Sequence, residues 1–293
     1  MSPRILSAIL ATAATSAGGI ALHAADSPYL PGAERTSVSL GASRSQYDNF
    51  FLGDQKVSNK DAFGSDEKVT QDSISLTGQY GLTKTLAVDL TVGYTRVDFK
   101  PVDLTNKGRD DTYLGLTTVT IDEFDPAIAE YHLPTVAIRV GAIIAGSYDS
   151  GAIGVPSAAG LGANGAEASL ILGKYCTEIK FGLTASVGFR NYVGDVPGQL
   201  LWSVGAYQSI VDQVVLSGRL HGSRATTGPD IAGPGFTGYF PGVREEKTEG
   251  ELSVTYTGMV DSQLGLFAAT VIDAGARNTG DATTFGFFVG HLF

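Results

Sequence analysis

The carboxy-terminal segment of the chain has the two-residue period of a β-strand. From Phe285 onward, every second position of the segment is large: Phe285, Phe287, Val289, His291 and Phe293. A period of two places these side chains on one face of a strand. In water, an aromatic face on a terminal strand would promote aggregation, whereas lipid covers the face and a closed barrel pairs the strand edges. The segment therefore favours a membrane-spanning β-barrel.

The closing Phe293 strengthens this interpretation. A final aromatic residue matches the carboxy-terminal signature of bacterial outer-membrane barrels, which the assembly machinery of those membranes recognises. We therefore expect three partners: the barrel-assembly machinery acting through Phe293, the lipid and lipopolysaccharide of the outer membrane, and a small-molecule solute.

The amino-terminal end predicts export. Ile5–Ile20 is an apolar, Ala-rich stretch after a short basic start, and His23-Ala24-Ala25 is a small-residue cleavage zone. These are the parts of a secretory signal peptide. We predict a cleaved signal peptide over residues 1–25 and a single barrel domain over residues 26–293, located in the Gram-negative outer membrane. Three cleavage positions stay open, after Ala21, Ala24 or Ala25.

The composition limits both partners and architecture. There are 20 Lys and Arg against 30 Asp and Glu, a net charge of −10, which argues against nucleic acid as a partner. After residue 25 the sequence has no apolar run of the roughly 18 residues that indicate a transmembrane helix. Strands of roughly 9–11 residues cross a membrane instead. Cys176 is the single cysteine, so no intramolecular disulfide forms.

Twelve segments have strand character, and residues 179–190 are the clearest because apolar residues alternate there with polar ones or Gly. The segments are 36–45, 70–80, 86–95, 111–121, 135–146, 166–175, 179–190, 199–210, 213–223, 252–256, 264–268 and 283–293. The alternation is blurred in 111–121 and 199–210, which leaves ten or fourteen strands as alternatives.

The connections between these segments tend to alternate between long and short. This parity is typical of an all-β, transmembrane, antiparallel up-and-down β-barrel of about 12 strands with both termini periplasmic, long loops outside and short turns inside. Residues 122–134 are an exception, a long connection where a periplasmic turn belongs. Asp125 followed by Pro126 predicts a helix N-cap and a single helical turn there.

The apolar phase of each strand must face lipid, since a charge at the bilayer midplane of a barrel costs roughly 2–4 kcal/mol. The opposite phase then lines the lumen. The predicted pore-lining residues are Asp89, Arg139, Glu167, Lys180, Thr184, Arg219 and Glu251. Both charge signs occur among them, so mutual pairing that holds the shape of the barrel is favoured over solute binding, although the two are compatible.

Two motifs suggest other chemistry and are disfavoured. Gly160–Gly165 spells GxGxxG, but a loop precedes it and strand character follows, so we interpret it as an outer loop and expect no cofactor. His221 and Ser223 resemble the His-x-Ser pair of outer-membrane phospholipases. In this chain their phase places them on the lumen side or at the loop mouth, and no orienting third group is visible. We therefore predict neither an enzyme nor a catalytic residue. The histidines are scattered, which predicts no metal site.

The layout of the chain resembles the outer-membrane protein family named for the meta-pathway of phenol degradation. Members carry a Gly-x-Gly-Asp segment followed by Leu-Gly, and Gly108–Gly115 is similar, with Asp110 where the second Gly would be. The closing Gly290–Phe293 is similar as well. The resemblance implies passage of small organic molecules and names no substrate.

These observations predict an outer-membrane channel for passive passage of small organic molecules, with aromatic or hydrophobic ones as candidates. A structural or adhesive barrel with functional surface loops is the first alternative, and an outer-membrane lipid hydrolase is the second. The identity of the solute, the oligomeric state and a plugging role for the amino-terminal segment stay open.

Overall fold

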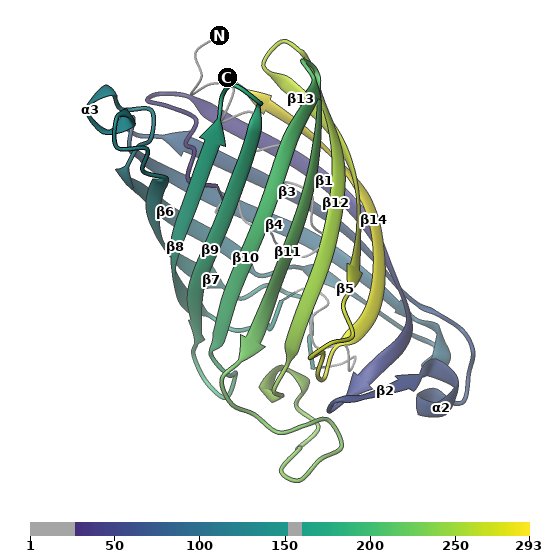
Figure 1. Cartoon of the computed structure of the whole chain (residues 1–293). Helices are drawn as coiled ribbons and strands as arrows, with labels where there is room; N and C mark the ends of the chain where they lie inside the picture. The colour runs from purple at the N-terminus through teal and green to yellow at the C-terminus, as the bar shows by residue number, and fades with distance from the viewer. Residues whose placement is uncertain (1–26, 152–159) are drawn as a thin grey trace.

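The structure, a computed structural model, describes residues 27–151 and 160–293, so the predicted signal peptide lies outside the described residues. Twelve antiparallel strands form one sheet that closes on itself because β14 pairs with β1 (Figure 1). They are β1 (Thr36–Leu52), β3 (Val69–Gly81), β4 (Leu86–Phe99), β6 (Thr112–Ile121), β7 (Thr135–Ile144), β8 (Gly165–Cys176), β9 (Phe181–Tyr192), β10 (Gln199–Val211), β11 (Val214–Ala225), β12 (Glu246–Met259), β13 (Ser262–Val271) and β14 (Gly280–Leu292). Each predicted segment overlaps one of these strands. The predicted fold class and the strand number of twelve are confirmed.

Two short strands were not predicted. β2 (Gln55–Ser58) pairs with β1, and β5 (Leu104–Arg109) pairs with β4. Both lie at the end of the barrel that carries the long loops (Figure 1). Their sequences lack apolar alternation because they extend the sheet beyond the lipid-facing band.

The helical elements are short: α2 (Asn59–Phe63), α3 (Pro126–Ala129), and the 3₁₀ turns η2 (Lys100–Val102) and η3 (Phe240–Gly242). Within the described residues, no helix has the length and apolar character needed to span a bilayer. The helical turn predicted in the connection 122–134 is confirmed as α3, where the Asp125 carboxylate accepts a hydrogen bond from the Ala127 N–H at 2.9 Å.

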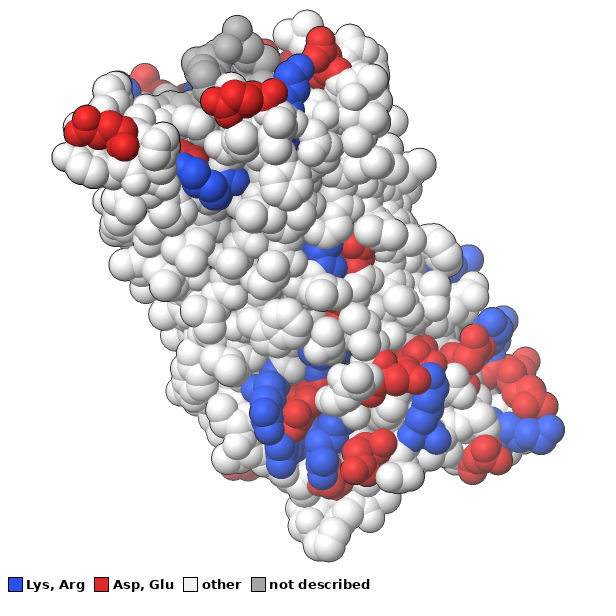
Figure 2. Space-filling model, viewed as in Figure 1, with Lys and Arg blue, Asp and Glu red and all other residues white. Residues whose placement is uncertain are grey.

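Burial alternates along the strands, and the two phases have opposite chemistry. In β9, Leu183 and Val187 are each nearly half exposed, whereas Thr184 between them is 7% exposed. In β14, the predicted face of Phe285, Phe287 and Val289 is exposed, and so is Phe293, which follows the strand. Since the sheet is closed, the buried phase points into the barrel. On the face shown in Figure 2, charged side chains gather towards the two ends and are scarce in the band between them. Such a band matches the apolar belt of an outer-membrane barrel.

The long-loop end is held by an aromatic cluster. Tyr47 and Phe50 from β1 pack with Phe99 from β4, and Phe63 of α2 meets Phe99 edge-on with ring centroids 4.9 Å apart. Because outer-membrane barrels carry long loops outside and short turns in the periplasm, this is the extracellular end. Thr36 and Leu292, the first and last residues of the barrel wall, lie at the opposite, periplasmic end.

Candidate channel interior

Six of the seven predicted pore-lining residues lie on the buried phase and point into the barrel. They are Asp89 on β4, Arg139 on β7, Glu167 on β8, Thr184 on β9, Arg219 on β11 and Glu251 on β12. The structure brings the charged members of this set together in two clusters on different parts of the wall.

The first ion-pair cluster is centred on Arg139. Its guanidinium donates from Nε to Asp89 Oδ1 at 3.1 Å and from Nη2 to Asp89 Oδ2 at 2.7 Å, and Nη1 binds Glu167. The other Glu167 oxygen accepts from Arg190 Nε at 3.0 Å and Nη2 at 2.9 Å. Fork-shaped guanidinium groups suit this two-point recognition of carboxylates. The cluster therefore ties β4, β7, β8 and β9 across the interior.

A glycine on β6 makes the Arg139–Asp89 pair possible. β6 lies between β4 and β7 in the sheet, and its Gly115 is in register with Asp89 on one side and Gly141 on the other. A Cβ at Gly115 would collide with the Arg139 guanidinium and the Asp89 carboxylate. The two ionic side chains meet over the bare backbone of β6, so only glycine fits there.

Arg190 also belongs to the inward-facing ion-pair cluster, although the sequence analysis did not include it among the pore-lining residues. Besides binding Glu167, its guanidinium lies 5.0 Å from the centroid of the Tyr113 ring, in cation–π geometry. The alternation along β9 could have identified Arg190, because it lies on the same face of the strand as Thr184. Its partner Tyr113 is buried on β6.

The second ion-pair cluster lies on β11 and β12. Arg219 and Glu251 are direct cross-strand neighbours, with Nη2 3.2 Å from Oε2. One step towards the extracellular end, Lys247 binds Glu249 at 2.9 Å. The interior wall thus carries charges of both signs on two separate arcs.

Lys180 is the exception among the predicted pore-lining residues. β9 begins at Phe181, and Lys180 lies in the periplasmic turn with φ of 51° and binds Asp212 of the neighbouring turn. This Asp212 carboxylate raises the pKa of the Lys180 amine. The alternation placed Lys180 inward because the pattern continues one residue beyond the strand, so the assignment of Lys180 to the lumen was wrong.

His221 and Ser223 share the inward phase of Ser217 and Arg219, as expected, and so point away from lipid. The structure also places Glu249 directly across from His221, a carboxylate that the sequence analysis did not connect with it. His221 Nε2 nevertheless has no hydrogen-bond partner in the described residues. Activation of a serine requires a hydrogen bond to its base, which this arrangement lacks. The part of the chain that the structure describes also contains no group of three or more side chains that would hold a metal ion.

The first residues that the structure describes cross the periplasmic mouth. Residues 27–35, here called the strap, lead into β1. They start beside β8, which lies on the opposite side of the closed sheet from β1. Tyr29 is buried and donates its hydroxyl hydrogen to Glu123 Oε1 at 2.6 Å, and burial and the nearby carboxylate raise the pKa of this tyrosine. A Cβ at Gly173 on β8 would lie 2.6 Å from Pro28 Cγ, so this glycine makes room for the strap.

The Gly108–Gly115 segment that carries the family resemblance organises the extracellular end. Asp111 accepts N–H hydrogen bonds from Gly146 at 2.9 Å and Leu161 at 2.8 Å and so anchors the loop between β7 and β8. Gly160, in the GxGxxG motif, has φ of 108°, and a Cβ added there would collide with the same carboxylate. Strand β8 begins at Gly165. The motif is therefore part of an outer loop, as predicted.

Comparison with solved structures supports the fold. An outer-membrane channel from Pseudomonas putida F1 matches with a TM-score of 0.67 and 15% identity, over 89% of this chain and 96% of that one. The translocator domain of the autotransporter NalP from Neisseria meningitidis matches with a TM-score of 0.50 and 11% identity, over 89% of each chain. In sequence, no family model and no curated protein matches. The chain therefore has the fold of outer-membrane β-barrels.

Proposed function

We propose that the chain is an outer-membrane channel for passive passage of small organic molecules. The observation that carries this proposal is the division of the wall into an apolar outer phase and an inner phase with two arcs of paired charges, around Arg139 and Arg219. Well-packed apolar residues in place of buried ion pairs often leave a protein equally or more stable. Stability alone therefore does not explain these charges. Polar and charged linings are the means by which pores select solutes.

The solute class is the finer part of the proposal. A barrel of twelve strands is intermediate between small barrels filled by side chains and wide sixteen-stranded porins. This size favours small molecules, and the resemblance of Gly108–Gly115 to the phenol meta-pathway family supports organic solutes, including aromatic or hydrophobic ones. Membership of that family is part of the same proposal.

Solute uptake by liposomes tests the channel directly. Vesicles with purified folded protein are expected to take up small neutral organic solutes faster than protein-free vesicles, and Arg190→Leu is expected to change the uptake of charged analogues more than that of neutral ones. Uptake equal to that of protein-free vesicles would favour the structural or adhesive barrel instead. The long loops are then the functional part, and their removal would abolish surface binding.

The cellular setting is proposed on the same basis. The exposed face of Phe285, Phe287 and Val289 supports contact with outer-membrane lipid, and exposed Phe293 supports recognition by the barrel-assembly machinery. Deletion of Phe293 is expected to lower the folded yield in the outer membrane, as measured by heat-modifiable migration. The cleaved signal peptide over residues 1–25 is tested by amino-terminal sequencing of the exported protein.

A further inference from the structure

Four basic side chains gather on the outer face of the barrel wall, towards its extracellular end. Arg96 on β4 is in register with Asp72 on β3, which is in register with Arg44 on β1. On its other side Arg96 is in register with Lys107 on β5, and Arg109 follows two residues along that strand. Direct cross-strand neighbours share one face of a sheet. The four basic residues, all of them exposed, are here called the basic patch.

The basic patch has more positive than negative charge. Arg44 and Arg96 each form an ion pair with an aspartate of the same face. Within the described residues, neither Lys107 nor Arg109 has a carboxylate at ion-pair distance, and the Arg109 guanidinium donates to the Ala145 carbonyl oxygen at 3.1 Å. Two basic groups are therefore left without an acidic partner, although the chain as a whole has a net charge of −10.

The positions of the basic groups favour a bound anion. Arg96 and Lys107 are direct cross-strand neighbours, and Arg109 lies diagonally from Arg96, within about 7–8 Å by sheet geometry. Like charges placed directly opposite each other destabilise a sheet. An anion between them removes this repulsion, and phosphate is the anion that guanidinium and ammonium groups bind most effectively.

Towards the bilayer, the basic patch borders exposed apolar surface. Tyr94 is in register with Arg109 on one side and with Ile74 on the other. These two residues, together with Leu76 and Leu90 on the same strands, are each nearly half exposed. A tyrosine between charged and apolar side chains is typical of the membrane interface. The surface thus suits a molecule with anionic groups on one side and hydrocarbon chains on the other.

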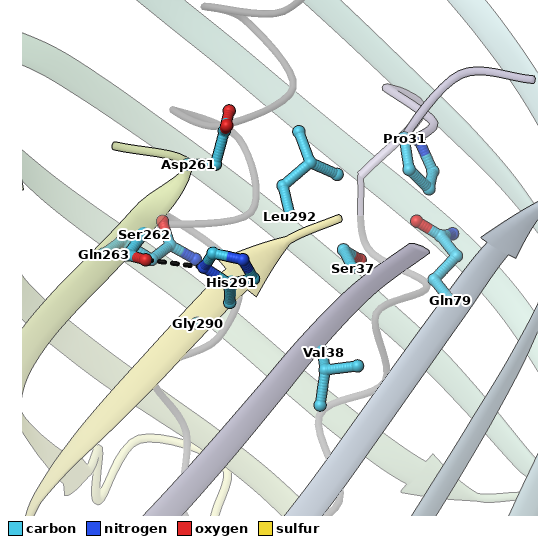
Figure 3. Close-up of a pocket in the computed structure, with 10 residues that line it drawn as sticks. All are labelled: Pro31, Ser37, Val38, Gln79, Asp261, Ser262, Gln263, Gly290, His291 and Leu292. Carbon is cyan, nitrogen blue, oxygen red and sulfur yellow. Dashed lines mark hydrogen bonds between the residues drawn. The ribbon is translucent and has the colours of Figure 1, made fainter. Parts of the chain in front are cut away.

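Other parts of the wall differ in chemistry. On the same outward phase, the extracellular halves of β6, β7, β9 and β10 expose apolar side chains: Leu114, Ile144, Phe189 and Leu200. At the periplasmic rim, Figure 3 shows Ser37 and Val38 of β1 and Gln79 of β3, and none of the labelled residues is a lysine or an arginine. The acidic residue among them, Asp261, pairs with Arg35 at 3.6 Å. The basic patch lies instead towards the outer leaflet, which consists of lipopolysaccharide.

We propose that the basic patch binds the phosphate groups of lipopolysaccharide. Arg96, Lys107 and Arg109 donate to the phosphate oxygens, and the acyl chains lie over the apolar surface of β3 and β4. This site goes beyond the proposed channel function, because it lies outside the barrel and requires no passage of a solute.

The test measures binding of defined lipids to folded full-length protein in micelles by native mass spectrometry. The probes are lipid A, which is the bisphosphorylated anchor of lipopolysaccharide, its dephosphorylated form, and phosphatidylglycerol. The comparison of the two lipid A forms isolates the phosphates. Phosphatidylglycerol distinguishes the glycolipid from other anionic lipids of the membrane.

Two triple variants carry the same change in net charge. The patch variant combines Arg96→Gln, Lys107→Gln and Arg109→Gln. The matched control neutralises three basic residues at the same end of the barrel but outside the basic patch: Lys56→Gln, Lys60→Gln and Arg224→Gln. Heat-modifiable migration verifies that each protein is folded. Lys107→Gln alone breaks no ion pair of the described residues, so it keeps the test open if the patch variant does not fold.

Wild-type protein and the matched control are expected to prefer bisphosphorylated lipid A over both other probes. The patch variant should bind it more than tenfold less tightly, and Lys107→Gln about fivefold less tightly, because each basic residue near an anionic lipid surface contributes about fivefold. Unchanged affinity in these variants, an equal loss in the matched control, or equally tight binding of phosphatidylglycerol by the wild type overturns the site. Solute uptake by liposomes is expected to be the same for wild type and patch variant, so failure of the lipid site leaves the channel standing.

Discussion

Two Arg–Asp pairs with similar two-point geometry lie on opposite faces of the barrel wall. On the outer face, Arg44 donates to Asp72 at 2.6 and 2.8 Å, and the side chains are 62% and 41% exposed. On the inner face, Arg139 donates to Asp89 at 3.1 and 2.7 Å, and the side chains are 1% and 0% exposed. The two pairs thus have similar hydrogen-bond geometry, although the outer pair is exposed and the inner pair is buried.

The difference shows where this barrel tolerates charge. The outer pair continues in register to Arg96 on β4, and this row lies on the extracellular side of the exposed Ile74 and Leu76. Charges on the outer face there mark the edge of the lipid-facing band, where water and headgroups solvate them. The inner pair has no such solvent, so it depends on its protein partners.

The largest difference between the two faces is expected when each arginine is replaced in turn. Arg139→Met leaves Asp89 buried without its partner and is expected to cost about 3–5 kcal/mol of unfolding free energy. Arg44→Met is expected to cost less than about 1 kcal/mol, as exposed pairs do. Urea unfolding of both variants in lipid vesicles measures the two costs. Similar costs would mean that the inner pair is solvated like the outer one.

Insertion of an arginine tests the two faces at neighbouring positions of β9. Val187 faces outward and Ser186 inward. Val187→Arg is expected to destabilise the barrel by roughly 2–4 kcal/mol if it lies near the bilayer midplane. Ser186→Arg should fold nearly as well and reduce solute flux. Equal destabilisation of the two variants in the same unfolding assay would contradict the assignment of the faces.

Asp110, in the extracellular connection between β5 and β6, is a partly buried residue whose buried carboxylate oxygen Oδ1 has no hydrogen-bond partner among the described residues. Burial raises its pKa from 3.8 to about 7. Between these values the folded state holds a proton that the unfolded state has lost, so stability should decline as pH rises through this range. Asp110→Asn should remove this decline and stabilise the barrel at pH 8 by about 1–3 kcal/mol.

Asp230 provides the control of opposite sign. Its hydrogen bond with Arg277 lowers its pKa, so its contribution to stability is present above the unfolded value and is lost as pH falls. Asp230→Asn should therefore destabilise the barrel at neutral pH. Melting temperatures of both variants between pH 4 and 8 measure these slopes. A flat wild-type profile with no effect of Asp110→Asn would refute the role of Asp110.

A small and local effect is expected at the strap. Tyr29→Phe removes one hydrogen bond to Glu123 and should cost about 1 kcal/mol locally. Amide hydrogen exchange of residues 29–35 should increase, while exchange in β9 stays unchanged. Faster exchange throughout the barrel would show that the strap supports the whole wall, in the way the Arg139 cluster does.

The sequence was sufficient for the twelve strands of the closed wall, but not for β2 and β5 or for the contacts between strands. A period of two predicted each strand of the wall and the inward face of Asp89, Arg139 and Glu167, because lipid on the outer face imposes a strict alternation. It did not show that Asp89 pairs with Arg139, since β6 separates their strands and the contact depends on Gly115. Lys180 was misplaced because alternation does not mark the residue at which a strand begins. The path of the strap across the mouth has no periodic signal either.

Single-channel conductance with an inward and an outward cysteine tests the central claim, passage through the interior of the barrel. In a Cys176→Ser background, Ser186→Cys and Val187→Cys are treated with a bulky, charged thiol reagent in planar bilayers. We expect both proteins to conduct and the reagent to block only Ser186→Cys, because that side chain faces the interior. Absence of conductance above the bare bilayer, or equal block of both variants, would contradict the channel.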